Sequence, residues 1–110
     1  MINLKDKNIV VTGGAGFLGR FVVEKLKQRR CSKIFIPRSK EFDLRKKGVC
    51  SKVVRNRDIV IHLAGHGGGI GLNIKHPGTL FYDNLIMGVQ LMEEARKANV
   101  EKFVTIGTIC

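Results

Sequence analysis

Short apolar runs alternate along the chain with longer amphipathic stretches, a pattern typical of parallel strands joined by helices. The runs that predict strands cover residues 8–11, 33–36, 58–64 and 101–106. Because each run is short and almost entirely apolar, both faces of the resulting sheet should be covered. The alternation predicts an α/β fold with a Rossmann-like doubly wound parallel sheet of about four to five strands.

The stretches between these runs space their apolar residues three and four positions apart, as helices do. The predicted helices cover residues 17–30, 45–57 and 77–99, and the middle one is the weakest because cations crowd it. The expected buried face of the first helix consists of Phe17, Leu18, Phe21, Val22 and Leu26. Met87 and Met92 are expected in the core beneath the last helix.

The doubly wound topology also predicts the order of the strands. The strand at 8–12 should be central, with the strand at 33–36 and any short strand near 43–44 on one side. The strands at 59–63 and 102–106 should lie on the other side. Since parallel strands end at one edge, the segments that follow them should meet there, where ligands of such sheets bind.

A glycine turn between the first strand and the first helix suggests a dinucleotide site. One of Gly13 and Gly14 lets the chain turn, Gly16 leaves room for a pyrophosphate, and Gly19 lets the helix pack closely. The helix start, at Phe17 and Leu18, would face the diphosphate with free N–H groups. A glycine turn without a ligand is the alternative.

The residue after the second strand favours NADP. NAD-binding domains commonly place an acid there for the ribose 2′-hydroxyl, whereas this chain has Arg38 and then Lys40. A cation suits a 2′-phosphate. Glu41 or Asp43 could still hold the ribose, which leaves NAD possible, and Arg38 could be only a solvated loop residue.

The third strand leads into a second glycine-rich segment at the same edge. Leu63, Ala64 and Gly65 open it, and glycines continue through 65–71. We expect this segment to contact the cofactor through its backbone, with a plain surface loop as the alternative. Asn84, in the last helix, either faces the site or is partly exposed.

Composition narrows the class of protein. Hydrophobic residues make up 44% of the 110 positions, enough for a core, and neither a membrane span nor a secretory signal is apparent. Cys31, Cys50 and Cys110 are odd in number and far apart, as expected of free thiols in a cytoplasmic protein. His62 and the other histidines lack metal-ligand spacing, so no metal site is predicted.

The net charge of +11 comes from the first half of the chain. Residues 1–57 contain 16 Lys and Arg against 4 Asp and Glu, while residues 58–110 contain 4 against 5. The cations are scattered, and the seven aromatic residues form no stacking platform with them. A solvated basic surface is therefore favoured over a nucleic-acid site.

Several motifs resemble one enzyme family. Residues 12–19 resemble the cofactor motif of the extended short-chain dehydrogenases/reductases, the sugar-nucleotide epimerase and reductase group. The stretches that are similar to the GDP-L-fucose synthases within it are residues 37–44, 62–73, 81–85 and 107–110. The resemblance spans nearly all 110 residues.

The resemblance implies NADP binding and conversion of GDP-4-keto-6-deoxymannose to GDP-L-fucose by epimerisation and reduction. It places Thr108 where the family has a catalytic serine, and Cys110 where it has the cysteine of the epimerisation. It also implies that Arg38 contacts the 2′-phosphate and that Asn84 lies near the catalytic group. Thr108 keeps the hydroxyl, and the Cys110 thiol could move a proton if its pKa were lowered.

Two departures indicate an N-terminal portion of such an enzyme. The Tyr-x-x-x-Lys pair is absent, because Tyr82 is followed four positions later by Ile86, and no nucleotide-sugar domain follows. His66 and Gly67 also differ from the expected substrate loop. We expect no turnover from this chain alone and, since its last strand would be an uncovered edge, self-association.

Three functions remain to be compared. The first is the NADP-binding part of a sugar-nucleotide epimerase-reductase, and the complete enzyme would be a homodimer acting on a GDP-sugar. The alternatives are a stand-alone non-catalytic nucleotide-binding module and another NAD-dependent sugar-nucleotide epimerase/dehydratase.

Overall fold

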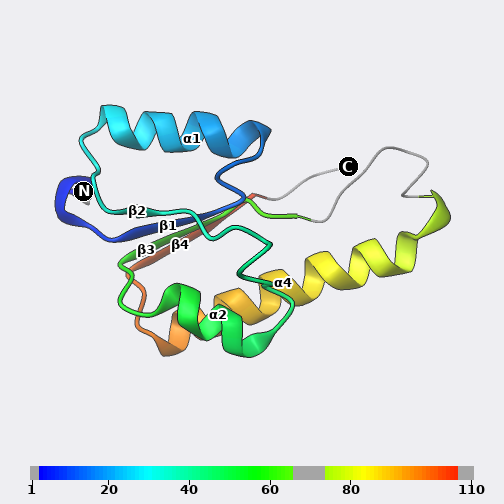
Figure 1. Ribbon diagram of the computed structural model, residues 1–110. Helices are drawn as coiled ribbons and strands as arrows, with labels where there is room; N and C mark the ends of the chain where they lie inside the picture. Colours follow the sequence, from blue (N-terminus) through cyan, green and yellow to red (C-terminus); the bar gives the residue numbers. More distant parts are fainter. Residues whose placement is uncertain (1–2, 66–73, 107–110) are drawn as a thin grey trace.

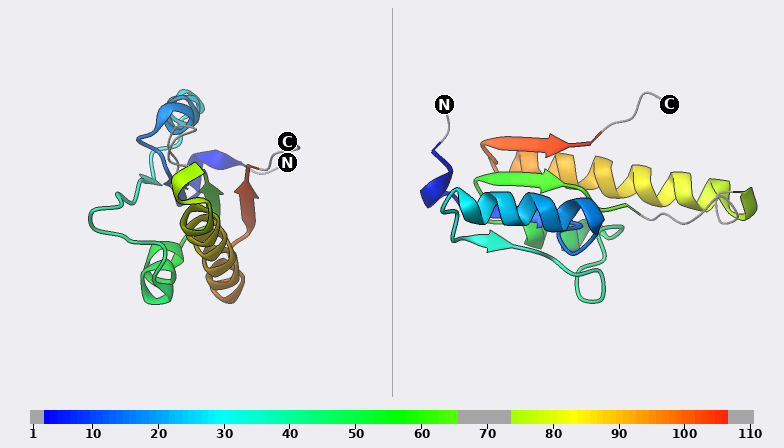
Figure 2. Two further views of the ribbon diagram at one scale, coloured as in Figure 1. Left: turned by 90° about the vertical axis from the view of Figure 1, so that its right-hand side faces the viewer. Right: turned by 90° about the horizontal axis from the view of Figure 1, so that it is seen from above.

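The computed structural model describes residues 3–65 and 74–106 and forms one parallel sheet between two layers of helices (Figure 1). The elements in chain order are η1 (Leu4–Asp6), β1 (Ile9–Thr12), α1 (Phe17–Gln28), β2 (Ile34–Phe35), α2 (Lys47–Val54), β3 (Ile59–His62), α4 (Pro77–Lys97) and β4 (Lys102–Thr105). Helix α1 covers one face of the sheet, and α2 and α4 cover the other (Figures 1 and 2). The predicted α/β fold is confirmed.

The strand order is β2-β1-β3-β4, and every pairing is parallel, as predicted. The strands therefore end at a single edge of the sheet (Figure 2). The short strand considered near 43–44 is wrong, because these described residues form a turn. Asp43 closes that turn by accepting hydrogen bonds from the Arg45 and Lys46 backbone amides, through its side chain and its carbonyl oxygen.

Alternate side chains of β1 point to opposite faces and divide the core in two. Val10 packs with the α2–α4 layer, around Val60 and Leu91, whereas Ile9 and Val11 pack with α1. Three of these residues, Ile9, Val10 and Val11, lie on β1, and every residue of this strand is buried. The central strand thus anchors both layers.

The predicted buried face of α1 is partly wrong. Phe17, Leu18 and Phe21 are 77%, 47% and 56% exposed, while Val23 and Leu26 are buried. The reason is the way α1 packs. Gly19 lies against the glycine turn, and this contact orients the helix so that Gly19, Val23 and Leu26 face the sheet. Phe17 and Phe21 pack edge to face on each other, with ring centroids 5.6 Å apart.

Helix α4 extends beyond the carboxyl edge of the sheet (Figure 1). Its buried line runs through Leu80, Met87 and Leu91, so the prediction for Met87 is confirmed. Met92 lies beside that line and is 51% exposed, so its predicted burial is wrong. The helix ends two residues before Asn99, which adopts a positive φ of 59° in the following turn.

The weak helix predicted within 45–57 is present as α2. Its buried residues Cys50, Val53 and Val54 pack against α4 and the sheet. Cys31 and Cys50 are free thiols, as expected, and burial raises the pKa of Cys50 to about 11. No helix among the described residues is long and apolar enough to cross a membrane.

Candidate cofactor site

The first glycine turn requires glycine for two separate reasons. Gly13 has a positive φ of 73°, a conformation that residues with a Cβ rarely adopt. A Cβ at Gly13 would also lie 2.8 Å from the Ala64 backbone nitrogen, so β1 and the end of β3 approach too closely for a side chain. Of the first two glycines, Gly13 is therefore the one that makes the turn.

Gly19 and Gly16 differ in what surrounds them. A Cβ at Gly19 would overlap the carbonyl oxygen of Gly13, so this glycine lets α1 sit on the turn. Among residues 3–65 and 74–106, a Cβ at Gly16 would meet only that same oxygen, at 3.3 Å, and Gly16 itself is exposed. Gly19 is thus needed by the fold, whereas the space beside Gly16 is open to a ligand.

The N-terminus of α1 has the features of an anion-binding helix end. Gly16 is its N-cap and makes no side-chain capping hydrogen bond, and the first turn contains no acidic residue. Phe17 and Leu18 contribute backbone amides there, while their side chains are exposed. The positive end of the helix dipole at 17–18 is therefore not neutralised by a capping carboxylate.

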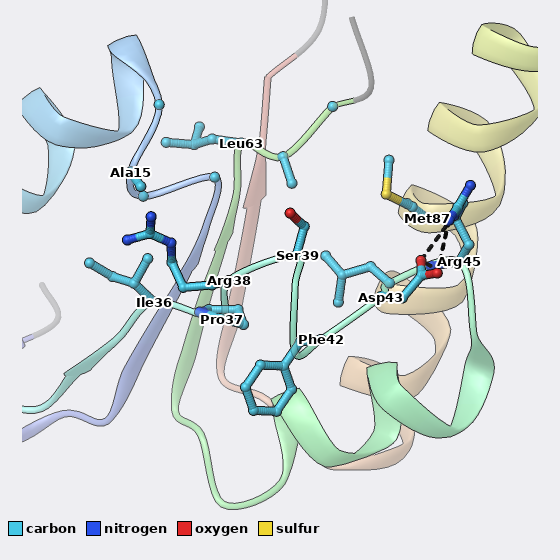
Figure 3. A pocket seen from close by; sticks show the side chains of 16 residues that line it. Ala15, Ile36, Pro37, Arg38, Ser39, Phe42, Asp43, Arg45, Leu63 and Met87 are labelled. Atoms are coloured by element: carbon cyan, nitrogen blue, oxygen red, sulfur yellow. Dashed lines mark hydrogen bonds and ion pairs between the residues drawn. The ribbon is translucent and has the colours of Figure 1, made fainter.

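A cavity of about 710 Å³ joins the segments that follow β1, β2 and β3 (Figure 3). Six residues predicted for the cofactor line it: Gly13, Gly16, Arg38, Leu63, Ala64 and Gly65. Ser39, Phe42, Arg45 and Met87 also line it and were not predicted from the sequence. Phe17, Leu18, Gly19 and Asn84 are not part of the lining.

Two arginines occupy opposite sides of this cavity. The Arg38 guanidinium points toward Ala15 in the glycine turn, whereas Arg45 and Asp43 lie beside Met87 (Figure 3). Arg45 donates two hydrogen bonds of 2.9 Å to the Asp43 carboxylate. These bonds lower the pKa of Asp43 to about 2, so this carboxylate is ionised and already paired.

Asn84 is exposed on α4 and lies near the end of β3. Its Oδ1 atom is 3.5 Å from the position that a Cβ on Gly65 would take. The neighbouring Asp83 is buried, and its carboxylate lies 3.5 Å from Arg45. Thr108 and Cys110 lie outside the described residues, so their catalytic roles stay predictions.

A buried polar cluster at the ends of β1 and β3 was not predicted from the sequence. Thr12 Oγ1 lies 2.6 Å from His62 Nδ1 and accepts hydrogen bonds from the amides of Leu63 and Ala64. Thr12 and His62 occupy matching positions in the two paired strands. The sequence shows only that Thr12 follows one apolar run and that His62 interrupts another, and the pairing of the two requires the register of β1 and β3.

No group of three or more metal-ligating residues occurs within 3–65 and 74–106. The cavity instead offers a helix N-terminus, an open glycine and a cation, the groups that suit a phosphorylated nucleotide.

Residues 9–110 match the model of the NAD dependent epimerase/dehydratase family. Among curated relatives, a GDP-L-colitose synthase from Yersinia pseudotuberculosis is 32% identical over 104 residues, covering 93% of this chain and 33% of that protein. A GDP-L-fucose synthase from Azorhizobium caulinodans is 30% identical over 108 residues, covering 96% and 34%. The chain spans about a third of the length of these relatives.

A solved structure gives a similar result. The crystal structure of a GDP-L-fucose synthetase from Naegleria fowleri bound to NADP superposes with a TM-score of 0.76 at 29% identity. The match covers 92% of this chain and 31% of that one.

Proposed function

The chain belongs to the NAD dependent epimerase/dehydratase family, and on this premise we propose that it is the NADP-binding N-terminal portion of a GDP-sugar epimerase-reductase. The observation that carries the proposal is the cavity in which the glycine turn, Arg38 and the end of β3 come together. These three segments are far apart in the sequence. Their meeting at the carboxyl edge of a parallel sheet is the arrangement in which such folds bind dinucleotides.

The residues of the cavity fit a dinucleotide. The amides at the start of α1 would hold the diphosphate, and the open side of Gly16 would let it approach the backbone. Leu63, Ala64 and Gly65 would line the far wall. When bound, the nicotinamide supplies or accepts a hydride.

The two arginines support NADP over NAD. Arg38 is exposed beside the glycine turn and is free to meet a 2′-phosphate with a forked guanidinium. Asp43, which was a possible partner for the ribose of NAD, is held by Arg45 instead. The pairing makes Asp43 a poorer acceptor for a ribose hydroxyl.

The names of the relatives support a GDP-sugar as substrate. Curated relatives include GDP-L-fucose and GDP-L-colitose synthases, which motivates the proposal that this chain serves the same class of reaction. In it, the Thr108 hydroxyl would hydrogen-bond the reacting carbonyl, and Cys110 would move a proton during epimerisation. Asn84 would support this group from α4. The complete enzyme would be a homodimer.

Cofactor titration by calorimetry tests the proposal. NADP should bind the wild-type chain more tightly than NAD, and Arg38→Ala should remove the preference by weakening NADP about tenfold or more. Lys40→Ala is the matched control, since it removes a nearby cation from the same loop and should leave most of the preference. Equal affinities for NADP and NAD in wild type and Arg38→Ala would contradict the role of Arg38.

Activity assays separate binding from catalysis. We expect no reduction of a GDP-keto sugar by this chain alone, because it contains no Tyr-x-x-x-Lys pair and a positioned proton donor contributes about 10²–10⁴-fold. Formation of GDP-L-fucose by the purified chain would refute this expectation.

A further inference from the structure

The Thr12 hydroxyl connects the carboxyl ends of β1 and β3. Its oxygen lies 2.6 Å from His62 Nδ1, 3.1 Å from the Leu63 nitrogen and 3.2 Å from the Ala64 nitrogen. The Leu63 amide is shared, since it also donates to the Thr12 carbonyl oxygen at 3.0 Å. The Ala64 amide therefore depends on the hydroxyl more than the Leu63 amide does.

The donors around this hydroxyl favour one protonation state of His62. A threonine hydroxyl has one proton to donate and two lone pairs to accept with. Because two amides are directed at Thr12 Oγ1, the arrangement that keeps both hydrogen bonds has the hydroxyl donate its own proton to His62 Nδ1. Nδ1 is then unprotonated, and the neutral imidazole carries its proton on Nε2. If Nδ1 also donated, three donors would be directed at an oxygen with two lone pairs, and one of the two amides would lose its hydrogen bond to Oγ1.

The surroundings of His62 favour the same neutral ring. The residue is 7% exposed, and burial lowers the pKa of its imidazole. Phe103 on β4 lies beside the ring, with centroids 6.3 Å apart, and a Cβ on Gly88 of α4 would lie 3.9 Å from Nε2. Both neighbours are uncharged.

The charged groups on the packed elements are directed elsewhere. Lys102 lies at the opposite end of β4, in register with Ile59. On α4, the buried Asp83 contacts Arg45, and the buried Glu94 contacts Lys97 at 3.3 Å. Strand β1 has no ionisable side chain. Burial is accordingly the cause of the shift, with no charge in the described residues contributing to it.

The segment whose amides donate to the Thr12 hydroxyl, Leu63 and Ala64, forms part of the wall of the cofactor cavity. Leu63 and Ala64 line it, and the Ala64 nitrogen is the atom that a Cβ on Gly13 would approach to 2.8 Å. We propose that His62 is a positioning residue which, in its neutral form, holds the Thr12 hydroxyl so that Ala64 stays in place, and that protonation of His62 releases this segment and weakens dinucleotide binding. The inference rests on the proposed function only for the identity of the ligand.

The proton balance of the release is simple. A proton added to Nδ1 turns that atom from an acceptor into a donor, and Thr12 Oγ1 becomes the acceptor. The hydroxyl proton then turns from Nδ1 into one of the two directions that the amides had occupied, so the oxygen keeps only one of its two amide donors. Leu63 retains the Thr12 carbonyl oxygen, so Ala64 is the amide that loses its acceptor.

The ligand-free chain gives the first test. Long-range ¹H–¹⁵N NMR should show His62 protonated at Nε2 and not at Nδ1 at neutral pH. Hydrogen exchange at Ala64 should become about 3- to 10-fold faster in His62→Phe and Thr12→Val, with Leu63 as the internal reference. His62→Asn keeps an acceptor at the Nδ1 position, and Thr12→Ser keeps the hydroxyl, so both should retain slow exchange. An Nδ1–H tautomer, or equal exchange in all variants, would overturn the inference.

Cofactor affinity gives the second test. The dissociation constant for NADP should rise about 3- to 10-fold more in wild type than in His62→Asn as the pH falls from about 7.5 to 5. The 2′-phosphate also titrates near pH 6, but it does so equally in both proteins. Parallel pH profiles would overturn the inference. If neither protein bound NADP at any pH while the NMR result held, the proposed function would fail and the role of His62 in positioning Ala64 would stand.

Discussion

Helices cover the two faces of the sheet to different extents. On one face α2 and α4 pack together over the sheet and enclose Val10, Val60 and Leu91, each fully buried. On the other face α1 covers the sheet beside β1 and β3, while Val104 and Ile106 at the β4 end are 40% and 61% exposed. We call these the closed face and the half-covered face.

The faces also differ in how their helices are held. The closed face is held by interdigitated side chains, so its stability should scale with buried apolar area. The half-covered face has its own side-chain packing, in which Val23 and Leu26 of α1 lie with Ile9 and Val11, and in addition a close backbone contact, where Gly19 of α1 meets Gly13 of the glycine turn. The same contact places the N-terminus of α1 at the cofactor cavity. The closed face thus supplies stability, and the half-covered face supplies the position of the site.

The largest expected effect is the loss of a closed-face side chain. Leu91→Ala should lower the free energy of unfolding by about 2–5 kcal/mol, because Leu91 is fully enclosed and a cavity would remain. Val104→Ala on the half-covered face should cost less than about 1 kcal/mol. Urea denaturation of both variants measures the difference, and equal losses would remove the distinction between the faces.

The second effect concerns the backbone contact. Gly19→Ala should destabilise the chain by about 1–3 kcal/mol, because the new Cβ would overlap the Gly13 carbonyl oxygen. Gly16→Ala should cost less than Gly19→Ala, about 1 kcal/mol or less, since its Cβ would lie 3.3 Å from the Gly13 carbonyl oxygen without overlapping it. Thermal or urea unfolding gives both values.

A larger side chain at Gly16 tests ligand binding separately from folding. Gly16→Val should remain folded, because the Gly16 backbone is extended with φ −78° and ψ −177°, which a β-branched residue can adopt. The variant should lose dinucleotide binding, because the valine side chain would occupy the space left for the pyrophosphate. A folded Gly16→Val variant with wild-type affinity would contradict the cofactor site.

The third effect is on self-association. β4 is an edge strand of the sheet formed by the described residues, and its exposed Val104 makes it a template for pairing. Val104→Lys should weaken self-association about tenfold, as measured by sedimentation at several concentrations under reducing conditions. Val89→Lys, at an exposed position on α4, is the control. A larger effect of Val89→Lys would assign the contact to the outer surface of α4.

A smaller, stabilising effect is expected on the closed face. In the part of the chain that the structure describes, no atom outside the adjoining backbone of α2 lies within 4 Å of the position that a Cβ on Gly48 would take. Gly48→Ala should raise the free energy of unfolding by about 0.5–1 kcal/mol. Alanine lowers the conformational entropy of the unfolded chain, and its backbone adopts the helical conformation of α2 readily. A destabilised Gly48→Ala variant in urea denaturation would show that α2 packs differently.

The smallest effect is the acid sensitivity of the turn before α2. Arg45 lowers the pKa of Asp43 to about 2, so the stabilisation from this pair is complete above about pH 4 and is lost as the pH falls toward 2. Arg45→Met should reduce that acid-dependent part of the unfolding free energy. An unchanged pH profile between 4 and 2 would show that the pair contributes nothing, as exposed pairs often do.

Several site features follow from local sequence and were predictable. The glycine turn between a strand and a helix identifies Gly13, Gly16 and Gly19, and the position after β2 identifies Arg38. The pairing of Asp43 with Arg45 was not predicted, because the sequence spacing alone does not show which of the many nearby cations turns toward Asp43.

The order of apolar runs, amphipathic stretches and glycines by itself determined the α/β class, the strand order and the edge at which the site lies. These follow from periodicity and from the right-handed connection of parallel strands, which act over short segments. The tertiary structure alone decided that Phe17 and Met92 face solvent and that Thr12 meets His62. Helix orientation and strand register set such contacts, and residues fifty positions apart acquire them only when the sheet has formed.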